Sequence, residues 1–317
     1  MPPGRLARPR APGWESGKDT SFAGRRFSAG YRAGVTTPFR AGSRVIDARL
    51  NRWLAFHEAR CHALVGREVR DLGDAVLLHD HADREPFWNR IAGVAWPREP
   101  ASFDRRLAEI LALFASLDRI PHIWPQPDFD EPPDLVDRLI ANGFVDMGSG
   151  MLMALDPSRL PPNPAVDRDG TGITVERLHR LAGSRVADVV RDVAIVLADA
   201  FGMEPGRGSA IEEETMILLG HEEFHVCLVR VDGEPAAAAR RTTFDGASYL
   251  SSIGTRQRFR GRGLGRVVTD IVTRDAIEAG SDLTYLGVFA DNVIARTMYE
   301  GLGYVPIGGP APDMLLQ

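Results

Sequence analysis

The second half of the chain alternates between two hydrophobic periods. Segments with apolar side chains at every second position predict strands, and segments with apolar side chains three and four positions apart predict helices. Asp232-Gly233 and Asp245-Gly246 separate neighbouring strand segments, and Asp-Gly is typical of hairpin turns. We expect strands at 172–178, 224–231, 234–243, 247–255 and 283–289, helices at 186–201, 211–219, 264–280 and 292–302, and an extended end from residue 304. This order predicts helices packed on a mixed sheet.

A proline-rich segment, 156–170, separates this half from the first. Its four prolines exclude a helix or a central strand. It therefore predicts a linker between one domain at 45–155 and another at 171–317. Two domains also fit the length of 317 residues, because single cores rarely grow beyond about 250 residues.

Composition excludes several classes of protein. Hydrophobic residues make up 44% and charged residues 26% of the chain, as in ordinary globular proteins. No apolar run approaches the roughly 18 residues that cross a membrane, so we expect no membrane partner. Two cysteines, Cys61 and Cys227, cannot form a disulfide framework and favour a reducing, cytoplasmic setting.

The net charge of −5 conceals an uneven distribution. Residues 1–44 carry eight Arg and one Lys against one Glu and one Asp, a net charge of +7, so the rest of the chain carries −12. This tail is rich in Gly and Pro, and it lacks both apolar periodicity and the apolar core of a secretory signal, so we expect disorder. Its arginines alternate with aromatic residues, which leaves an RNA-associated factor as one alternative. A solvated extension is the simpler interpretation, and we expect no nucleic-acid partner.

One glycine-rich segment carries candidate chemistry. Arg260-Gly-Arg-Gly-Leu-Gly265 joins the strand at 247–255 to an amphipathic helix. Backbone amides at such a turn converge with the positive end of the helix, glycines let a phosphate approach, and Arg260 and Arg262 add positive charge. The segment predicts a pyrophosphate site. A dinucleotide fingerprint would need glycine in place of Arg266, and a P-loop would need a lysine, so neither matches.

The match that remains is to a known superfamily. Arg260-x-x-Gly263-x-Gly265 resembles the Q/R-x-x-G-x-G/A signature of the GNAT superfamily of N-acetyltransferases. The run Asp291-Asn292-x-x-Ala295-x-x-x-Tyr299-Glu300-x-x-Gly303-Tyr304 resembles that family's closing strand, helix and strand. The resemblance covers about residues 171–317. It implies an α/β fold with a mixed, mostly antiparallel sheet flanked by helices.

The resemblance also implies roles for individual residues. Acetyl-CoA would be the co-substrate. The strand segment Ile253, Gly254 and Thr255 would offer backbone groups to its pantetheine arm, and Asn292 would contact it from the last helix. Tyr299 would be the general acid that protonates the departing thiolate. The pyrophosphate would be held by the backbone amides of Arg260, Gly261, Arg262, Gly263, Leu264 and Gly265.

The chemistry of a tyrosine agrees with this role. A thiolate with a pKa of about 8–9 needs a hydrogen-bond donor more than a strong acid, and a tyrosine hydroxyl supplies one. A core tyrosine is the alternative interpretation of Tyr299. No general base is assigned, because residues 249–255 contain no Asp or Glu. The candidates, each more typical of a solvated surface charge, are Glu222, Glu223, His225, Asp245 and the run Glu212–Glu214.

An offset of 160 residues aligns the first half with the second. Gly143-Phe144 falls on Gly303-Tyr304, and 89–96 falls on 249–256. The helical stripe Leu107, Ala108, Leu111 and Ala112 falls on Val267, Val268, Ile271 and Val272. These matches predict duplication of one unit, so that 45–155 is a degenerate GNAT-like domain in tandem with the other.

The first copy lacks the chemistry. Pro100–Arg105 takes the place of the glycine-rich loop without a glycine, and Pro132 and Leu139 stand opposite Asn292 and Tyr299. We therefore expect this copy to be a scaffold or a wall of the acceptor site, with Trp88, Trp96 and Trp124 in packing roles.

One motif in the first copy approaches a metal-site pattern. His57-Glu58-x-x-Cys61-His62 nearly spells a zinc-protease helix, but its second histidine falls one place late. We expect an ordinary helix and no metal.

Together these features predict an acetyl-CoA-dependent N-acetyltransferase with its catalytic domain at 171–317. It would transfer the acetyl group directly to a primary amine of an unidentified small molecule or peptide, and a homodimer is left open. The alternative is a non-catalytic sensor that binds acyl-CoA without transferring the acyl group.

Overall fold

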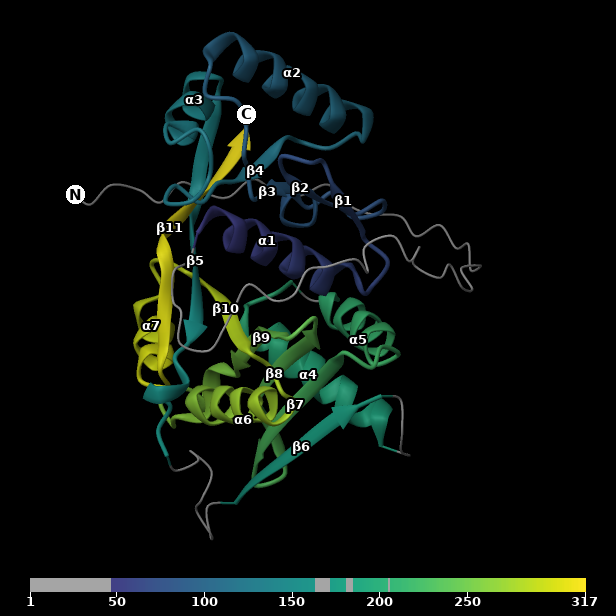
Figure 1. Cartoon of the computed structure of the whole chain (residues 1–317). Helices are drawn as coiled ribbons and strands as arrows, with labels where there is room; N and C mark the ends of the chain where they lie inside the picture. The colour runs from purple at the N-terminus through teal and green to yellow at the C-terminus, as the bar shows by residue number, and fades with distance from the viewer. Residues whose placement is uncertain (1–46, 163–171, 181–184, 205) are drawn as a thin grey trace, which may run out of the picture. The chain divides into compact units, whose positions relative to one another are not determined.

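The computed structural model describes residues 47–162, 172–180, 185–204 and 206–317 (Figure 1). The arginine-rich tail 1–44 and residues 163–170 of the expected linker lie outside the described residues. The expected domain boundaries at 155 and 171 stay a prediction. None of the helices in the described part of the chain is both long and apolar enough to span a bilayer.

The second half has the elements that its hydrophobic pattern predicts. Its strands are β6 (Ile173–His179), β7 (Phe224–Val231), β8 (Glu234–Phe244), β9 (Ala247–Thr255), β10 (Leu283–Phe289) and β11 (Tyr304–Leu316). Its helices are α4 (Val186–Ala200), α5 (Arg207–Leu218), α6 (Leu264–Glu278) and α7 (Val293–Glu300). β6 to β9 form an antiparallel meander, and β10 lies parallel to β9.

The two Asp-Gly turns close the meander as expected. Asp232 and Gly233 have φ of 51° and 84°, and Asp245 and Gly246 have φ of 51° and 77°. Positive φ at both central residues is the geometry in which a two-residue hairpin matches the twist of its strands.

The first half repeats the same plan with shorter strands. Its elements are α1 (Ala48–Ala63), β1 (Glu68–Asp71), β2 (Val76–His79), β3 (Arg90–Ala92), α2 (Pro100–Ser116), β4 (His122–Trp124), α3 (Leu135–Ala141) and β5 (Phe144–Leu155). β3 and β4 are parallel, as are β9 and β10. Shifted by 160 residues, α1, β3, β4 and β5 fall on α5, β9, β10 and β11. The structure therefore supports the duplication.

The last strands of the two halves, β5 and β11, pair with each other in the middle of the sheet (Figure 1). They are antiparallel, with Tyr304 opposite Leu155 and Leu316 opposite Phe144. β5 also pairs with β10 of the second half, and β11 pairs with β4 of the first. Each half therefore receives a strand from the other. The result is a single 11-stranded sheet in the order β1-β2-β3-β4-β11-β5-β10-β9-β8-β7-β6.

Helices cover both faces of the second half's sheet because side chains alternate along each strand. Leu250 of β9 and Leu286 of β10 face α6, where they join a core that includes Val268. The neighbouring residues Tyr249 and Tyr285 face the other way and pack against α1 of the first half. The apolar stripe expected on α6 is buried along its whole length.

The stripe expected on α2 is partly wrong. Ala108 and Ala112 are exposed, and Leu111 is half-buried. The buried residues are Phe103, Leu107, Ile110 and Phe114, which pack in the core of the first half. Burying a Phe or Ile side chain is worth more than burying an Ala, so the large side chains decide which face of the helix turns inward.

The strand exchange predicts a strong effect from the C-terminal end of the chain. Met314 on β11 is fully buried in the core of the first half. We expect Met314→Ala to lower the free energy of unfolding by about 2–5 kcal/mol, because it leaves a cavity. Met147→Ala, at an exposed position of β5, is the control and should cost less than about 0.5 kcal/mol. Urea denaturation should show one transition for both halves, and a separate transition of the first half alone would contradict the coupling.

Candidate active site

β9 and β10 separate from each other near the middle of the sheet. Their pairing joins residues 247–250 to 283–286. Beyond this region β9 continues to Thr255 and β10 to Phe289, and Gly287, the first residue of β10 past the pairing, is exposed. β10 keeps its partner on the other edge, where Phe289 pairs with Gly150 of β5. Unpaired backbone groups therefore line an opening between two central strands.

A bulge bends β9 beside this opening. Arg240 of β8 pairs with Ser251, and Ala238 pairs with Gly254, so two steps along β8 match three along β9. Ser252 lies in the left-handed region with φ of 49°. A bulge leaves one residue out of the ladder and turns its strand. Residues 253–255, which the resemblance assigns to pantetheine binding, follow this bend.

The glycine-rich loop forms an open cradle. Gly261 and Gly263 have φ of 78° and 76°, and beyond their chain neighbours no described atom lies within 4 Å of a Cβ built on either residue. α6 begins at Leu264, and no described side chain caps it. The free amides of the first turn and the positive end of the helix therefore face open space. This arrangement fits a pyrophosphate, and side chains at the glycines would fill the space it needs.

The two arginines of the loop have different surroundings. Arg260 donates from Nη2 to the Ala200 carbonyl oxygen at 2.7 Å and from Nε to the Thr255 carbonyl oxygen at 3.4 Å. It therefore ties the loop to the end of α4 and to β9. Arg262 is exposed, with its guanidinium 5.4 Å from the centre of the Phe259 ring, and contributes charge at the surface of the cradle.

Gly265 is the point where three expected elements of the site meet. A Cβ built on it would lie 3.3 Å from Met298 Sδ of α7 and 3.4 Å from Thr255 Oγ1 of β9. Arg266, the next residue, donates from Nη2 to the Gly301 carbonyl oxygen at 2.9 Å. The start of α6, the end of β9 and α7 are thus held together.

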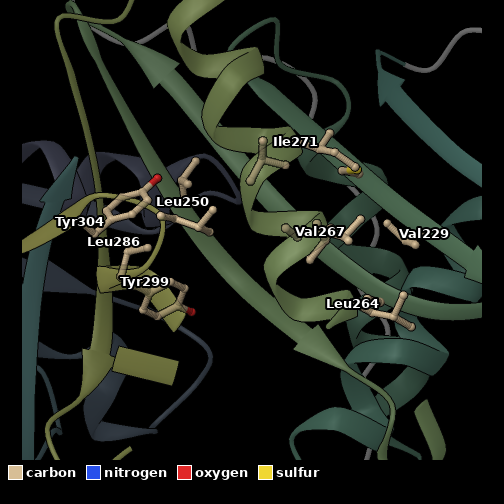
Figure 2. Packing of buried hydrophobic residues seen from close by; sticks show 14 of the residues in the cluster. Val229, Leu250, Leu264, Val267, Ile271, Leu286, Tyr299 and Tyr304 are labelled. Atoms are coloured by element: carbon tan, nitrogen blue, oxygen red, sulfur yellow. The ribbon is translucent and has the colours of Figure 1, made fainter. Parts of the chain in front are cut away.

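Tyr299 of α7 lies in the core beside these elements. Its side chain is 5% exposed and packs with Leu286 and edge-on to Tyr304, at 6.1 Å between ring centres (Figure 2). The Tyr304 hydroxyl is 2.6 Å from Thr273 Oγ1, whereas no residue in the described ranges forms a hydrogen bond with the Tyr299 hydroxyl. Burial raises the pKa of Tyr299 to about 12, so the hydroxyl stays protonated at neutral pH and can donate.

Asn292 caps α7. Its Oδ1 accepts a hydrogen bond from the Ala295 amide at 3.1 Å, and the residue is exposed. The cap explains an Asn at this position without a ligand. The contact with a cofactor, which the resemblance implies, stays a prediction.

Three of the candidate bases of the second half form ion pairs. Glu222 pairs with Arg180, Asp245 with Arg60, and Glu214 with Arg240 and Arg67. These ion pairs fit the interpretation of these residues as surface charges.

His225, another candidate base, lies on β7 and stacks on His179 at 4.1 Å between ring centres. Burial, with the charge of Arg241, lowers the pKa of His225 to about 4. β8 separates β7 from β9 in the sheet, so His225 lies two strands from the opening.

The matching position in the first half is closed by its own side chain. α2 begins at Pro100, and the Glu99 carboxylate accepts hydrogen bonds from the amides of Ala101 at 2.9 Å and Ser102 at 2.7 Å. A carboxylate thus occupies the helix N-terminus, and this copy offers no free amides to a phosphate. The expectation that the first copy lacks the anion site agrees with this geometry.

Sequence reasoning missed the polar contacts of α1. His57, Glu58 and His62 lie on the helix that covers Tyr249 and Tyr285, and Glu58 accepts two hydrogen bonds of 2.6 Å from Arg90 Nη2. The motif resembles a metal site in its sequence pattern. Within the described ranges, however, no group of three His, Cys, Asp or Glu side chains could hold a metal ion. The Glu and His spaced one helical turn apart were the signal.

The region around the cradle matches a known protein family in sequence. Residues 227–308 match the FR47-like protein family. No curated protein sequence is significantly similar to the chain.

Solved structures resemble nearly the whole chain. A GCN5-related N-acetyltransferase from Kribbella flavida is 25% identical, with a TM-score of 0.58, and the match covers 86% of this chain and 96% of that one. A GCN5-related N-acetyltransferase from Sphaerobacter thermophilus is 16% identical, with a TM-score of 0.57 and coverage of 85% and 91%. A tandem GNAT protein from the clavulanic acid biosynthesis pathway is 15% identical, with a TM-score of 0.52 and coverage of 78% and 80%. The expected fold of tandem GNAT-like units is confirmed.

The contact between Glu58 and Arg90 predicts a large loss of stability when it is broken. Arg90 is 2% exposed, so Glu58→Ala leaves a buried guanidinium without its carboxylate, and we expect a loss of about 3–5 kcal/mol. Glu68→Ala removes a similar two-bond contact with Arg70 near the surface and should cost less than about 1 kcal/mol. Chemical denaturation at neutral pH measures both. Equal effects of the two variants would contradict the assignment.

Proposed function

We propose that this chain, which belongs to the GNAT superfamily by the sequence and fold of its C-terminal half, is an acetyl-CoA-dependent N-acetyltransferase. It would transfer the acetyl group directly to a primary amine. The observation that carries the proposal is the open glycine cradle at the start of α6, next to the separated strands β9 and β10 and to Tyr299. Membership in the superfamily supports acyl transfer, and the geometry supports a CoA thioester as the donor.

The residues present suit the parts of such a donor. Amides of residues 260–265 would hold the pyrophosphate, and the backbone of residues 253–255 would pair with the amide groups of the pantetheine arm. The thioester would then reach the opening between β9 and β10, where unpaired amides could polarise its carbonyl group. The thioester supplies an activated acyl carbon, so the protein has to orient the two reactants and move protons.

Tyr299 would supply the proton that the thiolate takes. Its pKa, raised to about 12 by burial, keeps the hydroxyl protonated throughout the physiological range. The CoA thiol, with a pKa of about 8–9, is a stronger acid than this tyrosine, so the Tyr299 hydroxyl would first stabilise the departing sulfur as a hydrogen-bond donor. Net protonation of the sulfur would then draw on a proton that the acceptor nitrogen releases.

The cradle predicts a specific loss of binding. Gly263→Glu puts a carboxylate at the amides that would meet the pyrophosphate, and we expect the affinity for acetyl-CoA to fall at least about tenfold. Gly233→Glu is the matched control, because Gly233 also has positive φ and open space but lies in the β7–β8 turn. Isothermal titration calorimetry measures both. Equal affinity of the two variants would show that the cradle is not the binding site.

The general acid predicts a loss of turnover without a loss of binding. Tyr299→Phe should lower kcat by about 10²-fold or more while the Kd for acetyl-CoA stays unchanged. Tyr304→Phe, which changes the neighbouring ring and removes a hydroxyl bound to Thr273, should leave kcat close to that of the wild type. Release of the CoA thiol with primary amines is the measurement. Tight binding of acetyl-CoA without any thiol release from the wild type would favour a sensor over an enzyme.

A further inference from the structure

α1 carries side chains of the first half to the face of the sheet at which β9 and β10 separate. It packs through Leu50, Leu54 and Cys61 against Tyr249 and Tyr285. Tyr299 belongs to the core on the opposite face of the same strands, together with Leu250 and Leu286. A group on α1 can therefore approach the opening from the side opposite to the proposed acid.

Glu58 and His62 form a polar pair on this helix. His62 Nε2 lies 2.9 Å from Glu58 Oε1, and Arg90 Nη2 lies 2.6 Å from each carboxylate oxygen. Burial alone would raise the pKa of Glu58, but the charges of Arg90 and His62 and their hydrogen bonds outweigh it and lower the pKa to about 2. An ionised carboxylate can only accept, so in the neutral imidazole the proton sits on Nε2 and Nδ1 carries a lone pair.

Nδ1 of His62 is available to a ligand. No residue in the described ranges forms a hydrogen bond with it, and it is not one of the buried nitrogens without a partner. The side chain of His62 is 14% exposed.

His57 differs from His62 in each respect. Its Nδ1 is 2.7 Å from the Tyr285 hydroxyl, and its Nε2 is 3.2 Å from the Phe244 carbonyl oxygen. Burial lowers the pKa of His57 to about 4. His57 therefore has a structural role, and of these two histidines only His62 has a free basic nitrogen.

A single aromatic ring connects His62 to the opening. The His62 ring stands edge-on to Tyr249, with ring centres 5.5 Å apart, and the Tyr249 hydroxyl is 3.7 Å from a Cβ built on Gly287. Gly287 is the residue at which β10 leaves β9. Burial chiefly, with the charges of Glu58 and Tyr299 among the lesser causes, raises the pKa of Tyr249 well above its usual value. Tyr249 therefore lies between His62 and the residue at which the two strands part.

The remaining surroundings of His62 are aromatic and basic. Phe87 and Trp88 stand edge-on to its ring at 5.7 and 5.2 Å between centres. The charged groups that face it are Glu58, Arg90 and Arg67, and Arg67 donates to the His62 carbonyl oxygen at 3.0 Å. Arg67 and Arg90 also lie over the rings of Trp88 and Phe87, at 3.7 and 4.4 Å from the ring centres, and these bound guanidinium groups leave Nδ1 as the free acceptor.

We propose that His62 is the general base of the acyl transfer and that Glu58 positions it, so that the degenerate half supplies a catalytic group to the site of the other half. The inference rests on the proposed function. Nδ1 takes one proton from the ammonium form of the acceptor, and the freed lone pair forms the nitrogen–carbon bond with the thioester carbonyl carbon. The carbon–sulfur bond breaks with its electron pair on sulfur, which takes the Tyr299 proton. The second proton lost by nitrogen returns through solvent to Tyr299, and the His62 proton leaves to solvent.

His62→Gln in the full chain tests this role, because a glutamine amide can still donate to Glu58 but cannot take a proton. Four amines are first compared as acceptors for the wild type: phenethylamine, tryptamine, putrescine and lysine methyl ester. The one acetylated fastest is used as the acceptor in this test. We expect kcat to fall by about 10²-fold or more, with an unchanged Kd for acetyl-CoA by calorimetry. The fall in kcat/KM toward acid pH should disappear in the variant. Added imidazole should restore part of the activity of His62→Ala, which a purely structural histidine would not allow.

His81→Ala is the matched control, since His81 is an exposed histidine 3.5 Å from the carboxylate of Glu68, and it should leave kcat unchanged. A kcat of His62→Gln close to that of the wild type, an unchanged pH profile, or no rescue of His62→Ala by imidazole would each overturn the role of His62 and leave the proposed function standing. Absence of CoA release from the wild type with all four amines, together with absence of acetyl-CoA binding, would overturn the proposed function and this inference with it.

Discussion

The antiparallel pairing of β5 with β11 is the contact on which the rest of the structure depends. It places each half's last strand between the sheets of both halves, so β10 gains a partner on the edge away from β9. With that edge satisfied as far as Phe289, β10 can leave β9 after Leu286 and still keep its direction. An opening in the middle of a sheet costs backbone hydrogen bonds, and here the second edge holds the strand in place.

The same pairing gives the degenerate half its role. Because the Glu99 carboxylate accepts hydrogen bonds from the amides at the start of α2, this half has no cradle of its own. It still contributes β5 to the second sheet and α1 to the face beside the opening. Arg90 on β3 then fixes Glu58 of α1 through two hydrogen bonds. Because this half does not bind the acyl donor, its buried charged residues can serve the acceptor, as proposed for Glu58 and His62.

Local sequence signals predicted most of the second half, and long-range contacts account for what they missed. The bounds of β7 and β9 follow directly from the pattern, because β7 ends at the Asp232-Gly233 turn and β9 leads into the glycine-rich loop. The glycine-rich loop was predictable because positive φ and bare amides require particular residue types at particular positions. The exchange of β5 and β11 was not, since their register depends on strands more than a hundred residues away. The buried face of α2 was also misjudged, because its Phe and Ile side chains, rather than the repeat, decide what turns inward.

The role of α1 illustrates the limit of motif reasoning. His57 and His62 look equivalent in the sequence, and only the fold distinguishes them. Both ring nitrogens of His57 have hydrogen-bond partners, Tyr285 and Phe244, whereas Nδ1 of His62 has none among the described residues. The proposed acid and base then come from opposite faces of the sheet. Direct transfer needs the amine to lose a proton on one side of the acyl carbon while the sulfur gains one on the other, because nucleophile and leaving group are distinct atoms of a tetrahedral centre. An acid on α7 and a base on α1, with β9 and β10 parted between them, meet this requirement without a covalent acyl-enzyme. The strand exchange that builds the sheet thereby also sets the two proposed proton-transfer groups on either side of it.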